Sequence, residues 1–542
     1  MDVAFNSNED WMKLLLSKTK QHLQQIYQGG GVKSAAKQKE RNKLTARERI
    51  QYLCDQNRPF HELGAFAGFE MYALEGGCPA GGTVAGIGYI SGKQAVIVAN
   101  DQTVKAGAWF PITGKKNLRM QEIAMENHLP IIYLVDSAGV FLPMQDEIFP
   151  DKEHFGRIFR NNARMSAMGI TQIAAVMGAC VAGGAYLPIM SDETLMVENN
   201  GSIFLAGSYL VKAAIGESID NETLGGAVTH TEISGIADYK FKTEEACLDH
   251  IKSLMGSLGA STNAGFNRIE SIPPKKDPNE IYGQMPVGNG KPYDMLEIIE
   301  RIVDNSVFEQ FKKDYGKTIL CGYARIEGWS VGIVANQRLV SKNAKGEMQI
   351  GGVIYNDSAD KAARFIMNCN QKKIPLVFLQ DVTGFMVGSR SEHSGIIKDG
   401  AKLVNAVANS VVPKITIIIG NSYGAGNYAM CGKAYDPRFI YAWPSAKIAV
   451  MGGEQAAKTL LQIQVSTMKS KGKMVTPEEE KKLLDSIMDS YQKQTSPYYA
   501  AARLWVDEII DPLNTRMLIS DAIHAANQNP IMEKFSTGVF QV

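Results

Sequence analysis

The sequence predicts an α/β protein built from two similar halves. From about residue 80, short apolar segments alternate with glycine-rich turns and amphipathic segments, a pattern typical of buried, largely parallel strands covered by helices. Three sequence patterns from the first half also recur in the second half, in the same order and at nearly constant spacing. A repeat this long indicates duplicated domains and excludes a solenoid of short units.

The repeat centres on a strand that ends in aspartate and on a glycine-rich segment. Pro130-Ile-Ile-Tyr-Leu-Val-Asp136-Ser-Ala-Gly139 is echoed by Pro375-Leu-Val-Phe-Leu-Gln-Asp381-Val-Thr-Gly384, residues 178–186 are echoed by 420–428, and 98–100 by 334–336. Between the halves, proline- and glycine-rich stretches at 273–278 and 288–292 are linker-like. We therefore expect one domain over residues 1–275, with a helical N-terminal extension, and a second over 290–542.

The expected elements follow from local pattern. The first 50 residues are patterned as helix, and Thr45 followed by Glu48 has the spacing of a capping box. Apolar runs predict strands at 83–90, 94–99, 131–135, 173–176 and 414–419. Amphipathic runs predict helices at 114–128 and 154–168, and a charged run predicts one at 477–493.

Composition narrows the class of protein. A chain of 542 residues is long enough for two domains, and 45% hydrophobic with 21% charged residues is ordinary globular composition. The formal net charge of +1 gives no bulk field that would attract nucleic acid or an anionic membrane. The 7 cysteines include no CxxC pair and no Cys/His ligand spacing, so we expect reduced thiols and no metal in this chain.

One uncharged run, residues 173–190, approaches the length of a membrane span. Gly178, Gly183, Gly184 and Pro188 interrupt it and would break a spanning helix. We interpret the run as a buried strand, a glycine turn and the start of a buried helix, and we expect no membrane contact.

The glycine-rich turns are the candidate catalytic elements. In each half an apolar strand, 171–177 or 414–419, leads into small residues and then an expected helix. Small residues let the backbone approach a bound group, and amides at a helix start favour negative charge, so two such amides can form an oxyanion hole. The alternative is that Gly184 and Gly426 only permit tight strand–helix packing. Two equivalent turns favour catalysis, and valine at either glycine is expected to block the oxyanion while the fold survives.

Other catalytic signatures are missing from the sequence. There is no GxxxxGK[ST] phosphate loop, no GxGxxG opening a helix and no GxSxG elbow. Ser137 and Ser422 are nucleophiles by residue type, but no histidine stands in a suggestive place. A crotonase-type hydratase or isomerase would need a carboxylate beside the hole, and neither turn carries one within its small-residue core. A non-catalytic scaffold subunit would leave the paired turns unexplained.

At these residues the chain resembles the carboxyltransferase (β) subunits of biotin-dependent acyl-CoA carboxylases. The likeness extends from Lys43 to Arg516 and includes Pro79-Ala-Gly-Gly82, Ala182-Gly-Gly-Ala-Tyr186 and Gly424-Ala-Gly-Asn427. It implies two tandem crotonase-like domains of the ClpP/crotonase superfamily. It also implies that CO2 passes from carboxybiotin to an acyl-CoA enolate, while two backbone oxyanion holes stabilise the thioester and the biotin ureido oxygen.

The resemblance implies the following site. Gly183 with Gly184 would serve the thioester, and Ala425 with Gly426 would serve biotin. Substrate contacts would come from Lys105, Ala106, Gly107, Ala138, Gly139 and Phe141, and biotin contacts from Thr383, Gly384, Phe385 and Tyr423. The chain departs from the usual family pattern at 138–141 and at Asp381, which bears on the acyl pocket.

The resemblance also implies the substrate and the assembly. The first expectation is 3-methylcrotonoyl-CoA, with geranyl-CoA, propionyl-CoA or a related decarboxylation as alternatives. The sequence has no Ala-Met-Lys-Met-like biotinylation site, so biotin would arrive on a partner with biotin carboxylase and carrier functions. The chain would form a homo-oligomer, a hexamer arranged as a trimer of dimers, with active sites between subunits. The expected compartment is bacterial cytoplasm or the mitochondrial matrix.

Overall fold

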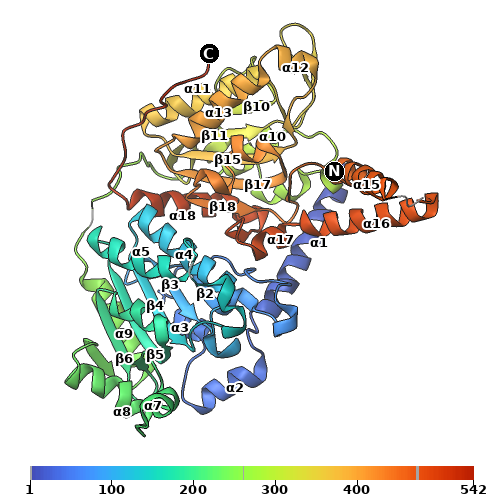
Figure 1. The fold of residues 1–542 in the computed structure, drawn as a ribbon. Helices are drawn as coiled ribbons and strands as arrows, with labels where there is room; N and C mark the ends of the chain where they lie inside the picture. The colour runs from blue at the N-terminus through green and yellow to red at the C-terminus, as the bar shows by residue number, and fades with distance from the viewer. Residues whose placement is uncertain (1–2, 150, 261, 472–474) are drawn as a thin grey trace. The chain divides into compact units, whose positions relative to one another are not determined.

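The computed structural model describes residues 3–149, 151–260, 262–471 and 475–542, and their contacts group the chain into two units (Figure 1). The first unit comprises residues 21–263 with 501–504, and the second comprises 1–20, 264–500 and 505–542. Residues 1–20 group with the second unit because the Phe5 ring covers Gly283 and Asn8 Nδ2 donates a hydrogen bond to the Gly283 carbonyl at 3.1 Å. Each unit is described by itself.

In the described part of the first unit the strands form one eight-stranded sheet. Its order is β1 (His61–Glu62), β2 (Thr83–Ile90), β3 (Lys93–Asn100), β4 (Ile131–Ser137), β5 (Gln172–Val181), β6 (Glu193–Val197) and β8 (Tyr239–Phe241), with β7 (Ser202–Phe204) paired to β5. The β1–β2 and β2–β3 pairs are antiparallel and the remaining pairs are parallel.

The second unit repeats this topology among its described residues. Its eight-stranded sheet has the order β20 (Glu508–Ile509), β18 (Phe439–Ala442), β17 (Lys414–Tyr423), β15 (Leu376–Val382), β11 (Trp329–Asn336), β10 (Ile319–Ile326) and β9 (Glu309–Gln310), with β19 (Lys447–Ala449) paired to β17. Read from β9, each strand corresponds in order and direction to one of the first sheet. The predicted α/β class with two similar halves is confirmed.

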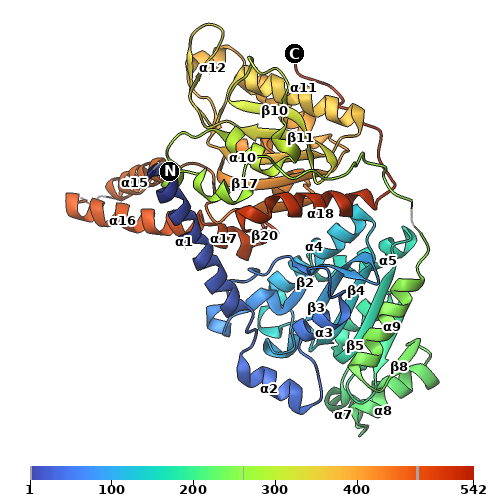
Figure 2. The same ribbon diagram turned by 180° about the vertical axis from the view of Figure 1, so that it is seen from behind.

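Helices cover both faces of the first sheet, as Figures 1 and 2 show. Residues of α3 (Ala46–Leu53) and α9 (Glu244–Ser257) share an apolar core with Leu134 of β4. Neighbouring residues of a strand point to opposite faces. Accordingly, Tyr133 lies on the other face, where its hydroxyl accepts a hydrogen bond from Gln121 Nε2 of α4 (Pro111–Asn127) at 3.1 Å.

The second sheet is covered in a similar way. Residues of α11 (Asn356–Lys372) and α13 (Ile396–Ala408) form an apolar core with Val334 and Phe378. The C-terminal helix α18 (Thr515–Asn527) is tied to the sheet where Trp443 Nε1 donates to Thr515 Oγ1 at 3.0 Å.

Most predicted elements are confirmed. Helices α1 (Val3–Ile26), α2 (Val32–Glu40) and α3 occupy the first 50 residues, and Thr45 and Glu48 form the predicted capping box. Helix α4 begins three residues before the predicted start at 114 because proline occupies its first turn, where no amide is needed. The run 173–190 is strand, turn and the short helix α6 (Tyr186–Ile189). Among the described residues, no helix is long and apolar enough to cross a membrane.

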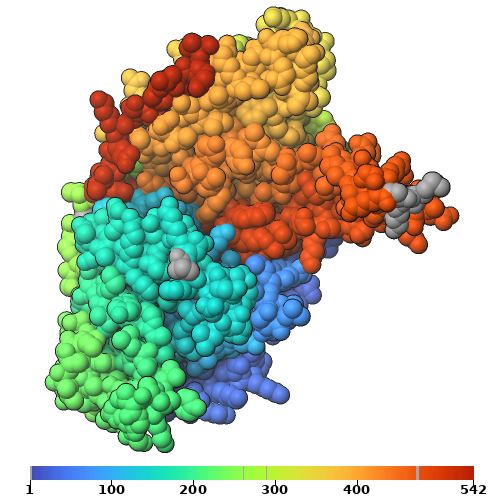
Figure 3. Space-filling view, viewed as in Figure 1, coloured from blue at the N-terminus to red at the C-terminus, as the bar shows by residue number. Residues whose placement is uncertain are grey.

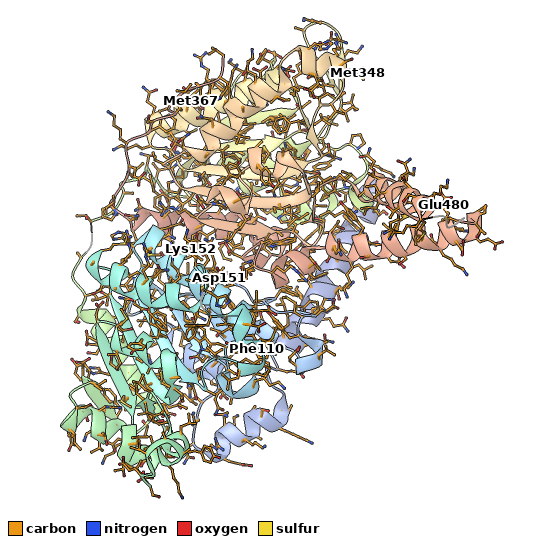
Figure 4. All side chains as sticks on the ribbon, viewed as in Figure 1. Phe110, Asp151, Lys152, Met348, Met367 and Glu480 are labelled. Carbon is orange, nitrogen blue, oxygen red and sulfur yellow. The ribbon has the colours of Figure 1, made fainter. Side chains whose placement is uncertain are left out.

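The second unit also carries a helical hairpin. Helices α15 (Gly453–Ser470) and α16 (Pro477–Gln494) pack against each other, and Figure 3 shows their exposed surface. Thr476 and Glu479 form a capping box at the start of α16, and Figure 4 labels the neighbouring Glu480. The charged helix predicted at 477–493 is confirmed.

Candidate active site

Both predicted turns begin at a residue with a positive φ. Ala182 follows β5 with a φ of 57°, and Gly424 follows β17 with a φ of 54°. A residue other than glycine seldom adopts this left-handed region, which costs energy and is often found at functional sites. The duplication has therefore kept an unusual bend at both places.

The helical segments after these bends are short. In the first unit a 3-10 turn, Ala182–Ala185, precedes α6, which has 4 residues; in the second unit, α14 (Ala425–Ala429) has 5. The predicted helices exist, but so few aligned peptides add little macrodipole. Any stabilisation of an anion comes from the amides themselves. Those of Ala425 and Gly426 lie in the first turn of α14, where no intrahelical acceptor is available.

A buried aspartate side chain packs against each strand that leads to a turn. A Cβ added at Gly178 would lie 1.8 Å from Asp136 Oδ1, and one added at Gly420 would lie 2.5 Å from Asp381 Cγ. Both positions require glycine because the carboxylate occupies the space of a side chain. These glycines begin the repeated segments, so the sequence repeat preserves a packing requirement.

The two aspartates have different partners. Asp136 Oδ2 contacts Lys43 Nζ at 2.6 Å and an Arg49 guanidinium nitrogen at 3.1 Å, all three side chains being buried. Asp381 Oδ2 accepts a hydrogen bond from the Tyr293 hydroxyl at 3.0 Å and lies 3.4 Å from Arg338 Nε. Burial raises the pKa of Asp381, and the charge of Arg338 opposes that rise.

In the first unit, the predicted substrate-binding segments lie side by side. The Ala138 amide donates to the Ala106 carbonyl at 3.1 Å, and Ser137 Oγ donates to the Gly107 carbonyl at 2.6 Å. A Cβ at Gly139 would lie 3.4 Å from the carbonyl of Val181, the residue before the first turn. Lys105, Ala106 and Gly107 all have positive φ, so this segment is tightly bent.

Aromatic side chains support this arrangement. The Phe141 ring stacks on Phe110, labelled in Figure 4, with centroids 4.3 Å apart. Phe155, the first residue of α5 (Phe155–Ala167), packs edge-on against Trp109, and a Cβ at Gly183 would lie 3.2 Å from its ring. Phe155 therefore connects the predicted acyl-CoA segment to the first turn.

A cavity of about 540 Å³ opens beside Lys105 and Ala106. Its lining includes the cationic side chains of Lys37, Arg41 and Lys105 and contains no acidic residue. Lys37 lies on α2 and Arg41 caps that helix. Positive charge therefore gathers here although the chain as a whole is nearly neutral.

In the second unit, Thr383 and Gly384 of the predicted biotin-binding residues lie beside the second turn. A Cβ at Gly426 would lie 3.3 Å from Gly384 Cα and 2.6 Å from Val382 Cγ2. Thr383 is held beside them because its amide donates to the Gly352 carbonyl at 2.8 Å. Valine at Gly426 would meet Val382 in that space, so the structure predicts a loss of stability for this variant, where the sequence predicts that the fold survives. At Gly184 no atom lies within 4 Å of an added Cβ.

The two aromatic residues predicted to bind biotin, Phe385 and Tyr423, are less available to a ligand. The Phe385 ring packs on α13, where a Cβ at Gly400 would lie 2.8 Å from it. Tyr423 ends β17 and is largely buried, and burial raises its pKa to about 12. Its hydroxyl stays protonated at neutral pH.

Ser137 and Ser422, the two serines that are nucleophiles by residue type, both donate their hydroxyl hydrogen to a neighbouring acceptor. Ser137 donates to Gly107 as described above, and Ser422 Oγ donates to Gln380 Oε1 at 2.6 Å. Sequence reasoning missed Phe155, Lys37 and Arg41. Their signals in the sequence were an aromatic residue at the start of a predicted helix and the lysine-rich segment at 33–43.

Comparisons with known proteins agree with this geometry. The family model of the carboxyl transferase domain matches residues 37–538. The methylcrotonoyl-CoA carboxylase beta chain of Arabidopsis thaliana is 47% identical over 545 residues, covering 99% of this chain and 90% of that protein. The biotin-dependent 3-methylcrotonyl-coenzyme A carboxylase beta1 subunit of Mycobacterium tuberculosis is 47% identical over 514 residues, covering 95% and 94%. The beta subunit of Pseudomonas aeruginosa geranyl-CoA carboxylase superposes with a TM-score of 0.86 at 36% identity, covering 99% and 97%.

A duplicated sheet, two matching glycine turns and this family match define a carboxyltransferase with two crotonase-like domains, and the chain belongs to the carboxyl transferase family. Within the family it is similar over nearly its whole length to methylcrotonoyl-CoA carboxylase β chains, which are components of biotin-dependent enzymes. The predicted family, fold class and enzyme class are confirmed.

Proposed function

We propose that this carboxyltransferase moves CO2 from carboxybiotin to 3-methylcrotonoyl-CoA, using the turns after β5 and β17 as two oxyanion holes. The observation that carries the proposal is the positive φ at both Ala182 and Gly424, each followed by small residues at a helix start. Transfer to an acyl-CoA develops negative charge at two oxygens in turn. Two preorganised pairs of amides match two oxyanions.

The first turn suits the thioester. Loss of a proton from a conjugated acyl-CoA places negative charge on the thioester oxygen, and the amides of Gly183 and Gly184 would donate to it. The segments at 105–107 and 138–139 lie next to this turn through their backbone contacts, so the thioester can lie between them. Asp136 is not available as a base because it is buried beneath the strand between Lys43 and Arg49.

The second turn suits biotin. Gly384 and Gly426 present backbone without side chains at close range, which admits a bicyclic urea, and Thr383 lies beside them. Carboxybiotin on a partner subunit would supply CO2 and, after releasing it, a urea nitrogen able to accept the substrate's proton. The amides of Ala425 and Gly426 would hold the ureido oxygen, so no side-chain base is required.

The cationic cavity suits the other end of the substrate. Coenzyme A carries several phosphate charges, and Lys37, Arg41 and Lys105 line the cavity beside the acyl-CoA segment. Phosphate oxygens favour lysine and arginine donors. Phe141, fixed flat on Phe110, would limit the length of the acyl chain.

The assembly belongs to the proposal as well. Residues 205–239 of the first unit expose large apolar side chains, among them Tyr209, Ile215 and Ile233, each more than 70% exposed. Apolar surface of this extent is typical of a protein–protein interface. It supports a homo-oligomer, which we propose to be a hexamer with active sites between subunits. A bacterial cytoplasm or the mitochondrial matrix would supply the biotinylated partner.

An acyl-CoA panel with the cognate biotinylated partner tests the proposal. We expect carboxylation to require the partner and kcat/KM to be highest for 3-methylcrotonoyl-CoA. A single methylene in an apolar pocket is worth about 1–3 kcal/mol, so branched C5 substrates should lead by about tenfold or more. Higher kcat/KM for geranyl-CoA or propionyl-CoA would overturn the substrate alone. No transfer with any acyl-CoA by a folded, partner-bound chain would favour a scaffold subunit.

A further inference from the structure

A chain of three hydrogen bonds, two of them buried, lies beneath the second turn. Asn427 Nδ2 donates to Ser422 Oγ at 2.8 Å, and Ser422 Oγ donates to Gln380 Oε1 at 2.6 Å. Gln380 Nε2 then donates to the Met430 carbonyl at 2.7 Å. Ser422 and Gln380 are completely buried, so water does not compete for the Ser422–Gln380 and Gln380–Met430 hydrogen bonds, while Asn427 is half-buried at the start of the chain.

The first unit has no such chain at the matching positions. The repeat places Val135 opposite Gln380, Cys180 opposite Ser422 and Ala185 opposite Asn427. Cys180 makes only a thiol contact with the Gly184 carbonyl at 3.3 Å, and the Phe155 ring supports Gly183 instead. The polar chain therefore belongs to the second turn and is not a requirement of the fold.

The hydrogen-bonded chain fastens α14 at its middle and at its C-terminal end. Asn427 is the third residue of α14, and Met430 is its C-cap. The Gly432 amide also donates to the Asn427 carbonyl at 2.7 Å. A helix of 5 residues cannot hold its own conformation, because helix nucleation is unfavourable. Its first amides keep their direction only if neighbouring strands fix it.

We propose that Ser422 and Asn427 are positioning residues that aim the amides of Ala425 and Gly426 through this chain. The assignment rests on the proposed role of the second turn in carboxyl transfer. Neither side chain needs to touch a reactant. Their effect is exerted through the backbone, where a displacement of about 1 Å can cost about a hundredfold in rate.

The test compares Ser422→Ala, Asn427→Ala and the double variant, each assayed with the biotinylated partner. We expect kcat to fall about tenfold in each single variant, with KM for the acyl-CoA unchanged within about twofold. Because both residues act through one chain, the double variant should lose no more than the worse single variant. Hydrogen exchange at the amides of 424–430 should accelerate in all three.

Ser358→Ala is the matched control. Ser358 is also fully buried in the second unit, but it caps α11, where its Oγ accepts from the Tyr355 amide at 2.9 Å. This variant should lose stability while keeping kcat and the exchange rates at 424–430.

Two results separate this inference from the proposed function. Wild-type kcat and wild-type exchange in folded Ser422→Ala and Asn427→Ala would overturn the positioning role while leaving carboxyl transfer intact. Full additivity of the two losses would also overturn it, because independent effects do not need a chain. If the wild-type enzyme transferred no carboxyl group, the proposed function would fail. The hydrogen-exchange data alone would then decide whether the chain of hydrogen bonds holds the second turn in place.

Discussion

The backbone amide of Asp136 donates a hydrogen bond to the side-chain oxygen of Asn100 at 3.2 Å. The second unit repeats this relationship, where the Asp381 amide donates to Asn336 Oδ1 at 3.1 Å. In both sheets the strand register shifts at the aspartate, between Val135 and Ser137 and between Gln380 and Val382. These shifts face β5 and β17, whereas the asparagines end β3 and β11, whose pairing with β4 and β15 stops at Leu134 and Leu379. Each asparagine therefore extends the contact between its strand and the aspartate strand beyond the last paired residues.

Removing this asparagine should destabilise the protein. Asn336→Ala leaves the buried Asp381 amide without its acceptor, and an unsatisfied buried donor costs about 1–3 kcal/mol. Urea denaturation of the two proteins measures the loss. Asn409→Ala, at an exposed helix end, is the control and should change the free energy of unfolding by less than about 0.5 kcal/mol. Equal unfolding curves for Asn336→Ala and wild type would contradict the role of the amide contact.

Valine at Gly184 should abolish turnover without unfolding the chain. An added Cβ at this position meets no atom within 4 Å and φ is not positive, so the fold has room for it. The side chain would occupy the proposed oxyanion position. Losing one donor in such a hole typically costs about a hundredfold or more in kcat. A folded Gly184→Val enzyme with near-normal kcat would contradict the role of the first turn as an oxyanion hole.

Gly426→Val provides the contrast. Here the new side chain would lie within 2.6 Å of Val382 Cγ2, so we expect a lower melting temperature together with the loss of activity. The two variants should therefore separate in thermal unfolding while agreeing in turnover. Identical melting temperatures would show that the packing under the second turn is looser than the structure indicates.

Lys116 should give the stability a specific dependence on pH. It is fully buried, its Nζ donates to the carbonyls of Ala80 and Thr83, and burial lowers its pKa to about 8. An unfolded lysine keeps its proton to about pH 10.4, so between these values the unfolded chain binds more protons and the free energy of unfolding rises with pH. Below pH 8 the full cost of burying the charge remains.

Comparison with Lys116→Met isolates this effect. The free energy of unfolding of wild type minus that of the variant should increase by about 3 kcal/mol between pH 8 and 10.4. Urea denaturation across this range measures it, and subtraction removes the titration of other groups. A difference that stays flat would mean that Lys116 remains protonated inside the protein.

Charge at the cationic cavity should control substrate affinity. Lys37→Gln removes a cation from the lining, so KM for the acyl-CoA should rise several-fold at low salt while kcat stays constant, and added salt should reduce the difference. Lys39→Gln on the same helix is the control, because Lys39 pairs with Glu48 at 3.3 Å and does not line the cavity. Equal KM values for the two variants would show that the cavity is not part of the acyl-CoA binding site.

Local pattern was enough for most of the elements. The strands at 83–90 and 131–135 and the capping box at Thr45 depend on residues close together in the chain, so a single stretch of sequence predicts them. The boundary of α4 was missed by three residues, since Pro111 begins a helix that has no other sequence signal there. The cationic cavity was not predicted, because nothing in the sequence places Lys37 beside Lys105.

The sequence by itself determined the duplication, the two glycine turns and the family, because strand period, glycine content and repeated motifs are properties of the chain order. Only the tertiary structure decided that Gln380, Ser422 and Asn427 form one hydrogen-bonded chain under the second turn, while Val135, Cys180 and Ala185 form none under the first. It also decided that valine fits at Gly184 and clashes at Gly426. The physical reason is that hydrogen bonds and steric contacts act across neighbouring strands, and pairing β15 with β17 brings together residues that lie about forty positions apart in the chain.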